Sequence, residues 1–124
     1  MSDETQIKDV VQTYFDCMYE SSAEKARSAF HPNAMITGYL EGELLQWSVD
    51  EFSGFVESQQ PSPKEQSAPE RIDILSLEIA GNTAAVQVRD DYLGMTFKDS
   101  LLLLKADDRW SIYSKLFHVE APSS

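Results

Sequence analysis

The feature that most constrains the fold is a series of long strand-like segments in the C-terminal half of the chain. They cover residues 71–79, 83–93, 97–105 and 110–119, and all are rich in β-branched, aromatic and aliphatic side chains. Short turn signals separate them, at Gly81-Asn82, at Gly94 and at Ala106-Asp107-Asp108. Connections this short join neighbouring antiparallel strands, because a parallel pair needs a long crossover. The sequence therefore predicts an antiparallel meander.

The first of these segments carries apolar residues in two phases. Ile72 and Ile74 share one phase, whereas Leu75, Leu77 and Ile79 share the other. A regular strand cannot turn both sets toward one core, since successive side chains point to opposite faces. We therefore predict a β-bulge near Ile74-Leu75.

The N-terminal half reads as helical. Apolar residues recur at helical spacing and Ser2 can cap the first turn, which predicts a first helix with this buried stripe: Ile7, Val10, Val11, Tyr14, Phe15 and Met18. A second helix is expected from Ser22 to Phe30, where His31-Pro32 ends it. A strand over 34–39 and a turn over 41–43 follow.

A third helix has the clearest start signal in the chain. Ser48 and Glu51 form a capping box, and Trp47 before it can pack on Phe52 as a hydrophobic staple. The proline-containing stretch after this helix is expected to be a loop. No repeat or internal boundary is visible, so we expect one domain over residues 1–124.

Composition excludes several classes of function. The 124 residues carry 21 acidic and 10 basic side chains, a net charge of −11, with no clustered basic face. Nucleic acid and anionic membranes are therefore not expected partners. The single cysteine, Cys17, can form neither an internal disulfide nor a thiolate metal site. The N-terminus lacks a basic start followed by an apolar run, so we expect no signal peptide and a cytoplasmic location.

The hairpin loops predict a register for the meander. An even loop around Gly94-Met95 places Asp90 opposite Asp99, and Tyr92 opposite Phe97. A four-residue loop over 106–109 places Leu103 opposite Ile112, Leu101 opposite Ser114, and Phe97 opposite His118. An odd loop instead would let the aspartates face water.

With this register, one end of the inner face becomes polar. The groups that converge there, among Val and Leu, are Asp90, Asp99, Tyr92, Ser114 and His118. Directly opposed carboxylates repel, burial raises the pKa of a carboxyl group, and a nearby histidine can relieve the repulsion by taking a proton. A few polar groups in an apolar concavity are typical of a small-molecule site, although a structural His–Asp pair has the same residues.

The outer face of the meander carries more apolar surface than soluble monomeric proteins usually expose to solvent. Its large side chains are Leu102, Leu104, Tyr113 and Phe117, and Lys115 lies on the same face. Since no helix remains to cover them, we expect a symmetric homodimer formed sheet against sheet, with solvent exposure as the alternative.

Three short motifs resemble a known superfamily. They are FHPNA at 30–34, FxDxLLLLK at 97–105 and WxIxxKxFH at 110–118. Together with the order of helices and strands, they resemble the nuclear transport factor 2-like superfamily, and most of all the small bacterial proteins labelled Putative lumazine-binding. The resemblance implies an α+β, cone-shaped (cystatin-like) fold, with three N-terminal helices on a curved antiparallel sheet.

The superfamily also includes enzymes of the ketosteroid isomerase, dehydratase and polyketide cyclase types, which work in the cone without metals. The resemblance matches the isomerase's pocket tyrosine to Tyr14 and its strand-borne acid to Asp90 or Asp99. Its proton-abstracting aspartate falls at about Gly38, which has no side chain. That isomerisation is therefore not expected here, because proton transfer needs a group within hydrogen-bond reach.

Three hypotheses about function follow. The first is binding of a small apolar or aromatic molecule, with a site that Tyr14, Tyr92, Trp47 and Ser114 would line. The second is a cofactor-free acid–base enzyme in which Asp99, His118 and Asp90 would be catalytic. The third is a dimeric interaction module whose cone is filled by its own side chains. Tyr14 and Trp47 have a purely structural interpretation as well, as core aromatic and helix staple. We expect no metal and no cofactor, since the histidines have no carboxylate at ligand spacing.

Overall fold

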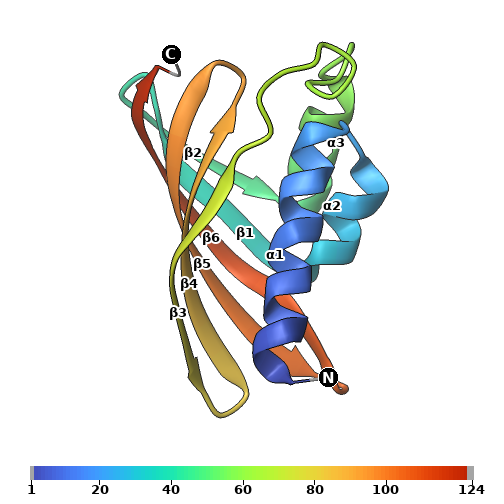
Figure 1. Ribbon diagram of the computed structural model, residues 1–124, viewed down its shortest axis with the longest axis vertical. Helices are drawn as coiled ribbons and strands as arrows, with labels where there is room; N and C mark the ends of the chain where they lie inside the picture. The colour runs from blue at the N-terminus through green and yellow to red at the C-terminus, as the bar shows by residue number, and fades with distance from the viewer. Residues whose placement is uncertain (1, 123–124) are drawn as a thin grey trace.

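The computed structural model describes residues 2–122 and has three helices on one side of a curved six-stranded sheet (Figure 1). The helices are α1 (Asp3–Tyr19), α2 (Ala23–Ala29) and α3 (Val49–Ser58). The strands are β1 (Phe30–Leu40), β2 (Glu43–Ser48), β3 (Ile72–Ala80), β4 (Thr83–Tyr92), β5 (Met95–Ala106) and β6 (Arg109–Pro122). The predicted α+β class and all three predicted helices are confirmed.

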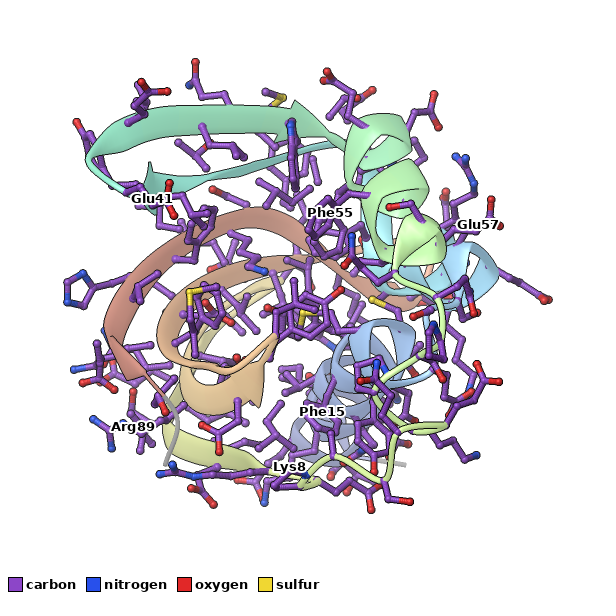
Figure 2. All side chains as sticks on the ribbon, turned by 90° about the horizontal axis from the view of Figure 1, so that it is seen from above. Lys8, Phe15, Glu41, Phe55, Glu57 and Arg89 are labelled. Carbon is purple, nitrogen blue, oxygen red and sulfur yellow. The ribbon has the colours of Figure 1, made fainter. Side chains whose placement is uncertain are left out.

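The strand order β2-β1-β6-β5-β4-β3 joins the two halves of the chain through the centre of the sheet. The predicted antiparallel meander β3–β6 is confirmed, and β1 adds to it by pairing parallel to β6. Figure 2 shows the sheet wrapping around an interior that α1 and α3 close from the other side. Phe55 of α3 lies on this inner side, and Arg89 of β4 points away on the outer side.

The start signals of the helices act as predicted. The Ser2 side chain accepts a hydrogen bond from the Thr5 amide. Both hydrogen bonds of the Ser48–Glu51 capping box are present. The Trp47 ring lies 6.4 Å from that of Phe52, centroid to centroid, as expected for a hydrophobic staple. These local contacts fix where α3 begins at the edge of the cone.

The predicted bulge in β3 is confirmed. The pairing of β3 with β4 shifts between Ile74 and Ser76. As a result Ile72 and Leu77, which differ in phase along the sequence, both pack against the core.

The register between β4 and β5 differs from the prediction by two residues. The loop has only two residues, Leu93 and Gly94, so that Tyr92 pairs with Met95 and Asp90 pairs with Phe97. Both loop residues have positive φ, 52° and 75°, as a tight hairpin turn requires. The predicted pairing of Asp90 with Asp99 is therefore wrong. A shift of two leaves the faces unchanged, and both aspartates still point inward.

The register between β5 and β6 starts as predicted and then changes phase. Leu103 does pair with Ile112, but the pairing shifts beyond it, so that Ser114 lies opposite Leu102 and Lys115 opposite Leu101. From this irregularity to Val119 the side chains of β6 face the side opposite to the predicted one.

Several predictions for β6 are therefore wrong. His118 lies exposed on the outer face, and Ser114 is only half-buried. Lys115 is buried, and Phe117 packs against the core and not on the outer face. On that outer face Leu102 and Tyr113 remain exposed and Leu104 is half-buried, with Leu116 exposed beside them. Association through this face remains a prediction.

Gly38 of β1 has no room for a side chain. A Cβ atom there would lie 2.6 Å from the Phe117 ring and 2.6 Å from the Phe117 carbonyl oxygen. Because part of this contact is backbone, we expect Gly38→Ala to lower the free energy of unfolding by about 1–3 kcal/mol, measured by urea denaturation. Gly54→Ala in α3 is the control, since its Cβ meets nothing within 4 Å. The control should be neutral or stabilising by up to ~1 kcal/mol. Equal stability of the two variants would contradict this interpretation.

Candidate functional site

A cavity of about 210 Å³ lies between the helices and the concave face of the sheet. Its lining is almost entirely apolar and aromatic, with side chains from α1, α3 and all strands except β3. Asp90 of β4 and Lys115 of β6 are its only charged lining residues within the part of the chain that the structure describes. The cavity is therefore an apolar space of the size of a one- or two-ring molecule, with one acid and one base in its wall.

Asp90 is buried in this wall, and as a carboxylate it has no hydrogen-bond donor for either oxygen within residues 2–122. Burial raises the pKa of Asp90 well above 3.8. The charge of Asp99 and a side-chain hydrogen bond with Asp99 raise it further, whereas the charge of Lys115 lowers it. A protonated Asp90 can donate to Asp99, and its other oxygen atom stays free to bind a ligand in the cavity.

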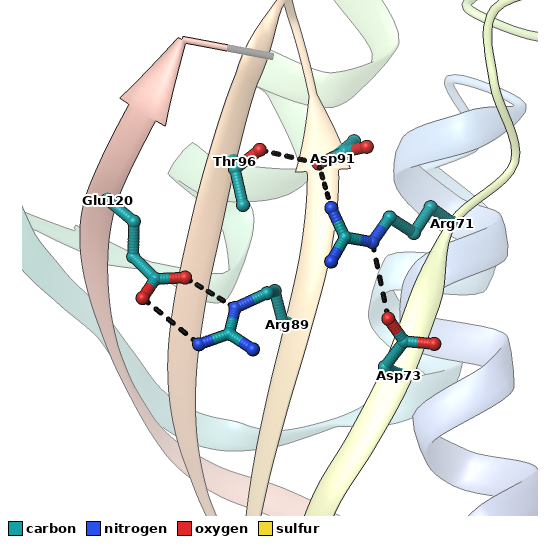
Figure 3. A network of polar contacts seen from close by, with 6 residues as sticks. All are labelled: Arg71, Asp73, Arg89, Asp91, Thr96 and Glu120. Atoms are coloured by element: carbon teal, nitrogen blue, oxygen red, sulfur yellow. Dashed lines mark hydrogen bonds and ion pairs between the residues drawn. The ribbon is translucent and has the colours of Figure 1, made fainter. Parts of the chain in front are cut away.

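The neighbours of Asp90 in β4 are held on the outside of the sheet (Figure 3). Arg89 donates two hydrogen bonds to Glu120, at 2.6 and 3.1 Å. Asp91 accepts from Thr96 at 2.8 Å and from Arg71 at 3.5 Å. Because alternate side chains in a strand point to opposite faces, these outer contacts fix the phase that turns Asp90 inward.

Tyr14 and Asp99 form a buried pair next to Asp90. The Tyr14 hydroxyl donates to Asp99 Oδ2 at 2.6 Å, and Asp99 Oδ1 has no partner in the described structure. Burial and the charges of Asp99 and Asp90 raise the pKa of the Tyr14 hydroxyl well above 10.0. Neither Tyr14 nor Asp99 lines the cavity. Tyr14 is thus a core aromatic residue, and its hydroxyl group donates to Asp99 and not into the cavity.

Lys115 is the functional candidate that sequence analysis missed. Its Nζ lies 4.7 Å from the ring centroid of Tyr14, 4.9 Å from that of Phe52 and 5.6 Å from that of Phe117. No hydrogen bond or ion pair of Lys115 is present within residues 2–122, so no carboxylate oxygen lies within 4.0 Å of it. The three rings position the amine at the cavity wall and leave its N–H groups free for a ligand.

Of the other predicted site residues, some line the cavity and others do not. Trp47 and Tyr92 line the cavity, and the buried Tyr92 hydroxyl has no partner within the described residues. Ser114 and His118 do not line it, and the exposed His118 lies on the opposite face of the sheet from both aspartates. The inner site is therefore acid, lysine and phenol groups without an imidazole.

The described residues offer no metal site, no membrane-spanning helix and no reactive thiol. Within residues 2–122 no group of three or more His, Cys, Asp or Glu side chains could hold a metal ion. None of the described helices combines the length and the apolar character that crossing a membrane requires. Cys17 is buried, and burial raises the pKa of its thiol to about 12, which leaves no reactive thiolate.

The fold and the cavity define the class of the protein, which is the nuclear transport factor 2-like class with an interior pocket. More narrowly, the chain belongs to the Putative lumazine-binding family, whose model matches residues 2–118. The resemblance inferred from the three motifs is thus confirmed.

Relatives of known structure share the fold along their whole length. An NTF2-like protein of unknown function from Silicibacter pomeroyi DSS-3 is 27% identical, with a TM-score of 0.81 over 97% of this chain and 100% of that one. One from Methylobacillus flagellatus KT is 26% identical, with a TM-score of 0.82 over 98% and 96%. A relative named aldolase FrzH, from Cladobotryum sp, is 27% identical over 85% of this chain and 82% of its own.

Proposed function

We propose that this chain binds a small, mainly apolar molecule in the cavity, with an oxygen atom of that molecule facing Lys115 and Asp90. The observation that carries the proposal is that Asp90 and Lys115 open on the same apolar space, and that the Lys115 amine has no ion pair within the described structure. Buried polar groups in native proteins are normally hydrogen-bonded. A ligand carbonyl or carboxylate oxygen would accept from the Lys115 amine, and a protonated Asp90 could donate to it as well.

The aldolase relative supports a second candidate, a cofactor-free enzyme that acts on a carbonyl compound. In this candidate Asp90 keeps the acid–base role that the sequence suggested. No histidine takes part, because His118 lies on the outer face of the sheet. Asp99 and Tyr14 would position and tune Asp90 from behind the cavity wall. Proton transfer then needs only a substrate oxygen or carbon within reach of the Asp90 carboxyl group.

Acetophenone is a suitable probe for the binding proposal, because it combines one aromatic ring with a carbonyl oxygen. Ethylbenzene is the control, with the same ring and two-carbon side chain but no carbonyl oxygen. We expect acetophenone to bind at least ~10-fold more tightly, since ethylbenzene would leave the buried polar groups unpaired. Ligand-detected NMR saturation transfer, with each compound titrated, measures this difference. Equal affinities would contradict a role for Lys115 and Asp90 in recognition.

Filling the cavity should remove binding. Leu45 of β2 lines the cavity, whereas its neighbour Leu44 is 56% exposed and does not line it. We expect Leu45→Trp to abolish saturation transfer to acetophenone and Leu44→Trp to preserve it, because adjacent residues in a strand face opposite sides. Binding that persists in Leu45→Trp, or is lost equally in both variants, would place the ligand elsewhere.

A further inference from the structure

We propose that Lys115 is a nucleophile that forms an iminium ion with a ketone or aldehyde held in the cavity, and that Asp90 moves the protons of this reaction. The inference rests on the proposed function and deepens it, since it names carbonyl compounds with a hydrogen on the neighbouring carbon as the substrate class. It assigns the chemistry to Lys115, which the sequence analysis placed on the outer face of the sheet and gave no role in the site.

The surroundings of the Lys115 side chain are the first argument. It is 5% exposed, its Nζ is bordered by three aromatic rings, and no carboxylate oxygen lies within 4.0 Å. A lysine in a hydrophobic pocket without a direct counter-ion is the arrangement in which this side chain acts as a nucleophile. A lysine serving only stability would instead extend its amine to water or to an acid.

The position of Asp90 is the second argument. Asp90 and Lys115 line the same cavity from β4 and β6, near enough for the charge of Lys115 to act on Asp90, but they do not form an ion pair. A carbonyl group can therefore lie between them, with its carbon toward the amine and its oxygen toward the acid. Asp90 lines the cavity directly, and at least one of its oxygens has no partner other than Asp99 within the described residues. Asp99 cannot replace it, because Asp99 does not line the cavity and accepts from Tyr14.

The steps balance without a cofactor. The Lys115 ammonium releases one proton to bulk water, the resulting amine adds to the carbonyl carbon, and one of its nitrogen protons passes to the oxygen, which gives a neutral carbinolamine. Asp90, as the carboxylic acid, protonates the hydroxyl group, the C–O bond breaks and water leaves, so that an iminium ion and the Asp90 carboxylate remain. The carboxylate then takes a proton from the neighbouring carbon, which gives an enamine and restores the acid. The enamine carbon is the nucleophile that a carbon–carbon bond-forming step requires.

Reductive trapping tests the first step. The protein is incubated with acetophenone and sodium cyanoborohydride, which reduces an iminium ion much faster than a ketone, and is then digested and analysed by peptide mass mapping. We expect the reduced adduct on Lys115 ahead of the surface lysines, with Lys64 as the exposed internal control. Lys115→Arg keeps the positive charge and should lose the adduct at this position completely. Labelling of Lys64 and other surface lysines with none at Lys115 would overturn the inference.

Isotope exchange tests the second step and does not depend on any one variant folding. In D₂O the wild-type protein should exchange the methyl hydrogens of acetophenone for deuterium, which NMR follows. Asp90→Asn should lose the exchange and most of the reduced adduct, since it lacks the acid for both steps, whereas Asp91→Asn, altered on the outer face, should keep both. Binding of acetophenone with neither adduct nor exchange would overturn the inference and leave the binding proposal standing. Absence of binding would overturn both.

Discussion

Asp90→Asn is expected to make the protein more stable at neutral and alkaline pH and to flatten the dependence of its stability on pH. Burial in the cavity wall, together with the negative charge of Asp99, raises the pKa of Asp90 well above 3.8 in the folded protein. In the unfolded chain the same carboxyl group ionises near its ordinary value. The asparagine side chain has the shape of the protonated acid but cannot ionise, so the variant avoids the cost of a buried charge.

The sign of this effect follows from proton binding. Between the unfolded and the raised folded pKa, the native state holds a proton that the unfolded state has released, so the free energy of unfolding falls as pH rises. The fall is about 1.4 kcal/mol per pH unit for one proton. It begins near pH 4 and ends where the pH passes the raised pKa of Asp90. The stability gained by Asp90→Asn therefore grows with pH over this interval and is smallest in acid.

Urea denaturation of both proteins at several pH values measures this difference. Acidic groups away from the Asp90–Asp99 pair titrate alike in the two proteins, so the difference between the curves isolates this pair. Asp91→Asn is the matched control, since Asp91 lies on the outer face and accepts from Thr96 and Arg71. The control should lose a little stability and show no gain that grows with pH. Parallel curves for wild type and Asp90→Asn would contradict burial of an ionisable Asp90.

Those parts of the fold that depend on local chemistry could be read from the sequence. The capping box at Ser48 and Glu51 involves residues of a single helical turn, and it correctly predicted the start of α3. The two apolar phases around Ile74 lie within a single strand, and they correctly predicted the β-bulge. The inward direction of Asp90 could also be predicted, even though its partner was wrong, because a shift of two residues does not change the face. The two-residue turn was missed because Leu93, which adopts positive φ in it, is an unusual residue for that position.

The error at Lys115 has a different origin. The irregularity after Ile112 depends on how a long, curved strand pairs with β1 and β5 at once, which no local signal in the sequence encodes. One weak sign was present, since Leu116 and Phe117 are adjacent and a strand buries only one of them. The usual preference of lysine for water then favoured the wrong phase. Polar groups placed against such preferences are often functional, because stability alone would not retain them.

Lys115→Met is expected to stabilise the protein while it removes the chemistry of the site. Taking a buried ammonium out of water costs several kcal/mol, and Lys115 has no ion pair to offset that cost. Its contacts with the aromatic rings recover only about 2 kcal/mol, so the apolar and similarly long methionine should raise the free energy of unfolding by about 1–4 kcal/mol. A gain in stability at the expense of function is typical of residues retained for activity.

The coupling between Lys115 and Asp90 gives this prediction a second, independent readout. The charge of Lys115 lowers the pKa of Asp90, so its removal raises that pKa further and keeps Asp90 protonated in the fold to higher pH. The pH interval over which stability falls therefore extends upward in Lys115→Met, and its gain over wild type shrinks as pH rises. Lys64→Met, an exposed control, should match wild type at every pH. If Lys115→Met is instead clearly destabilised, the ring contacts hold a structural cation, and the lysine is a packing element and not the nucleophile of a carbonyl site.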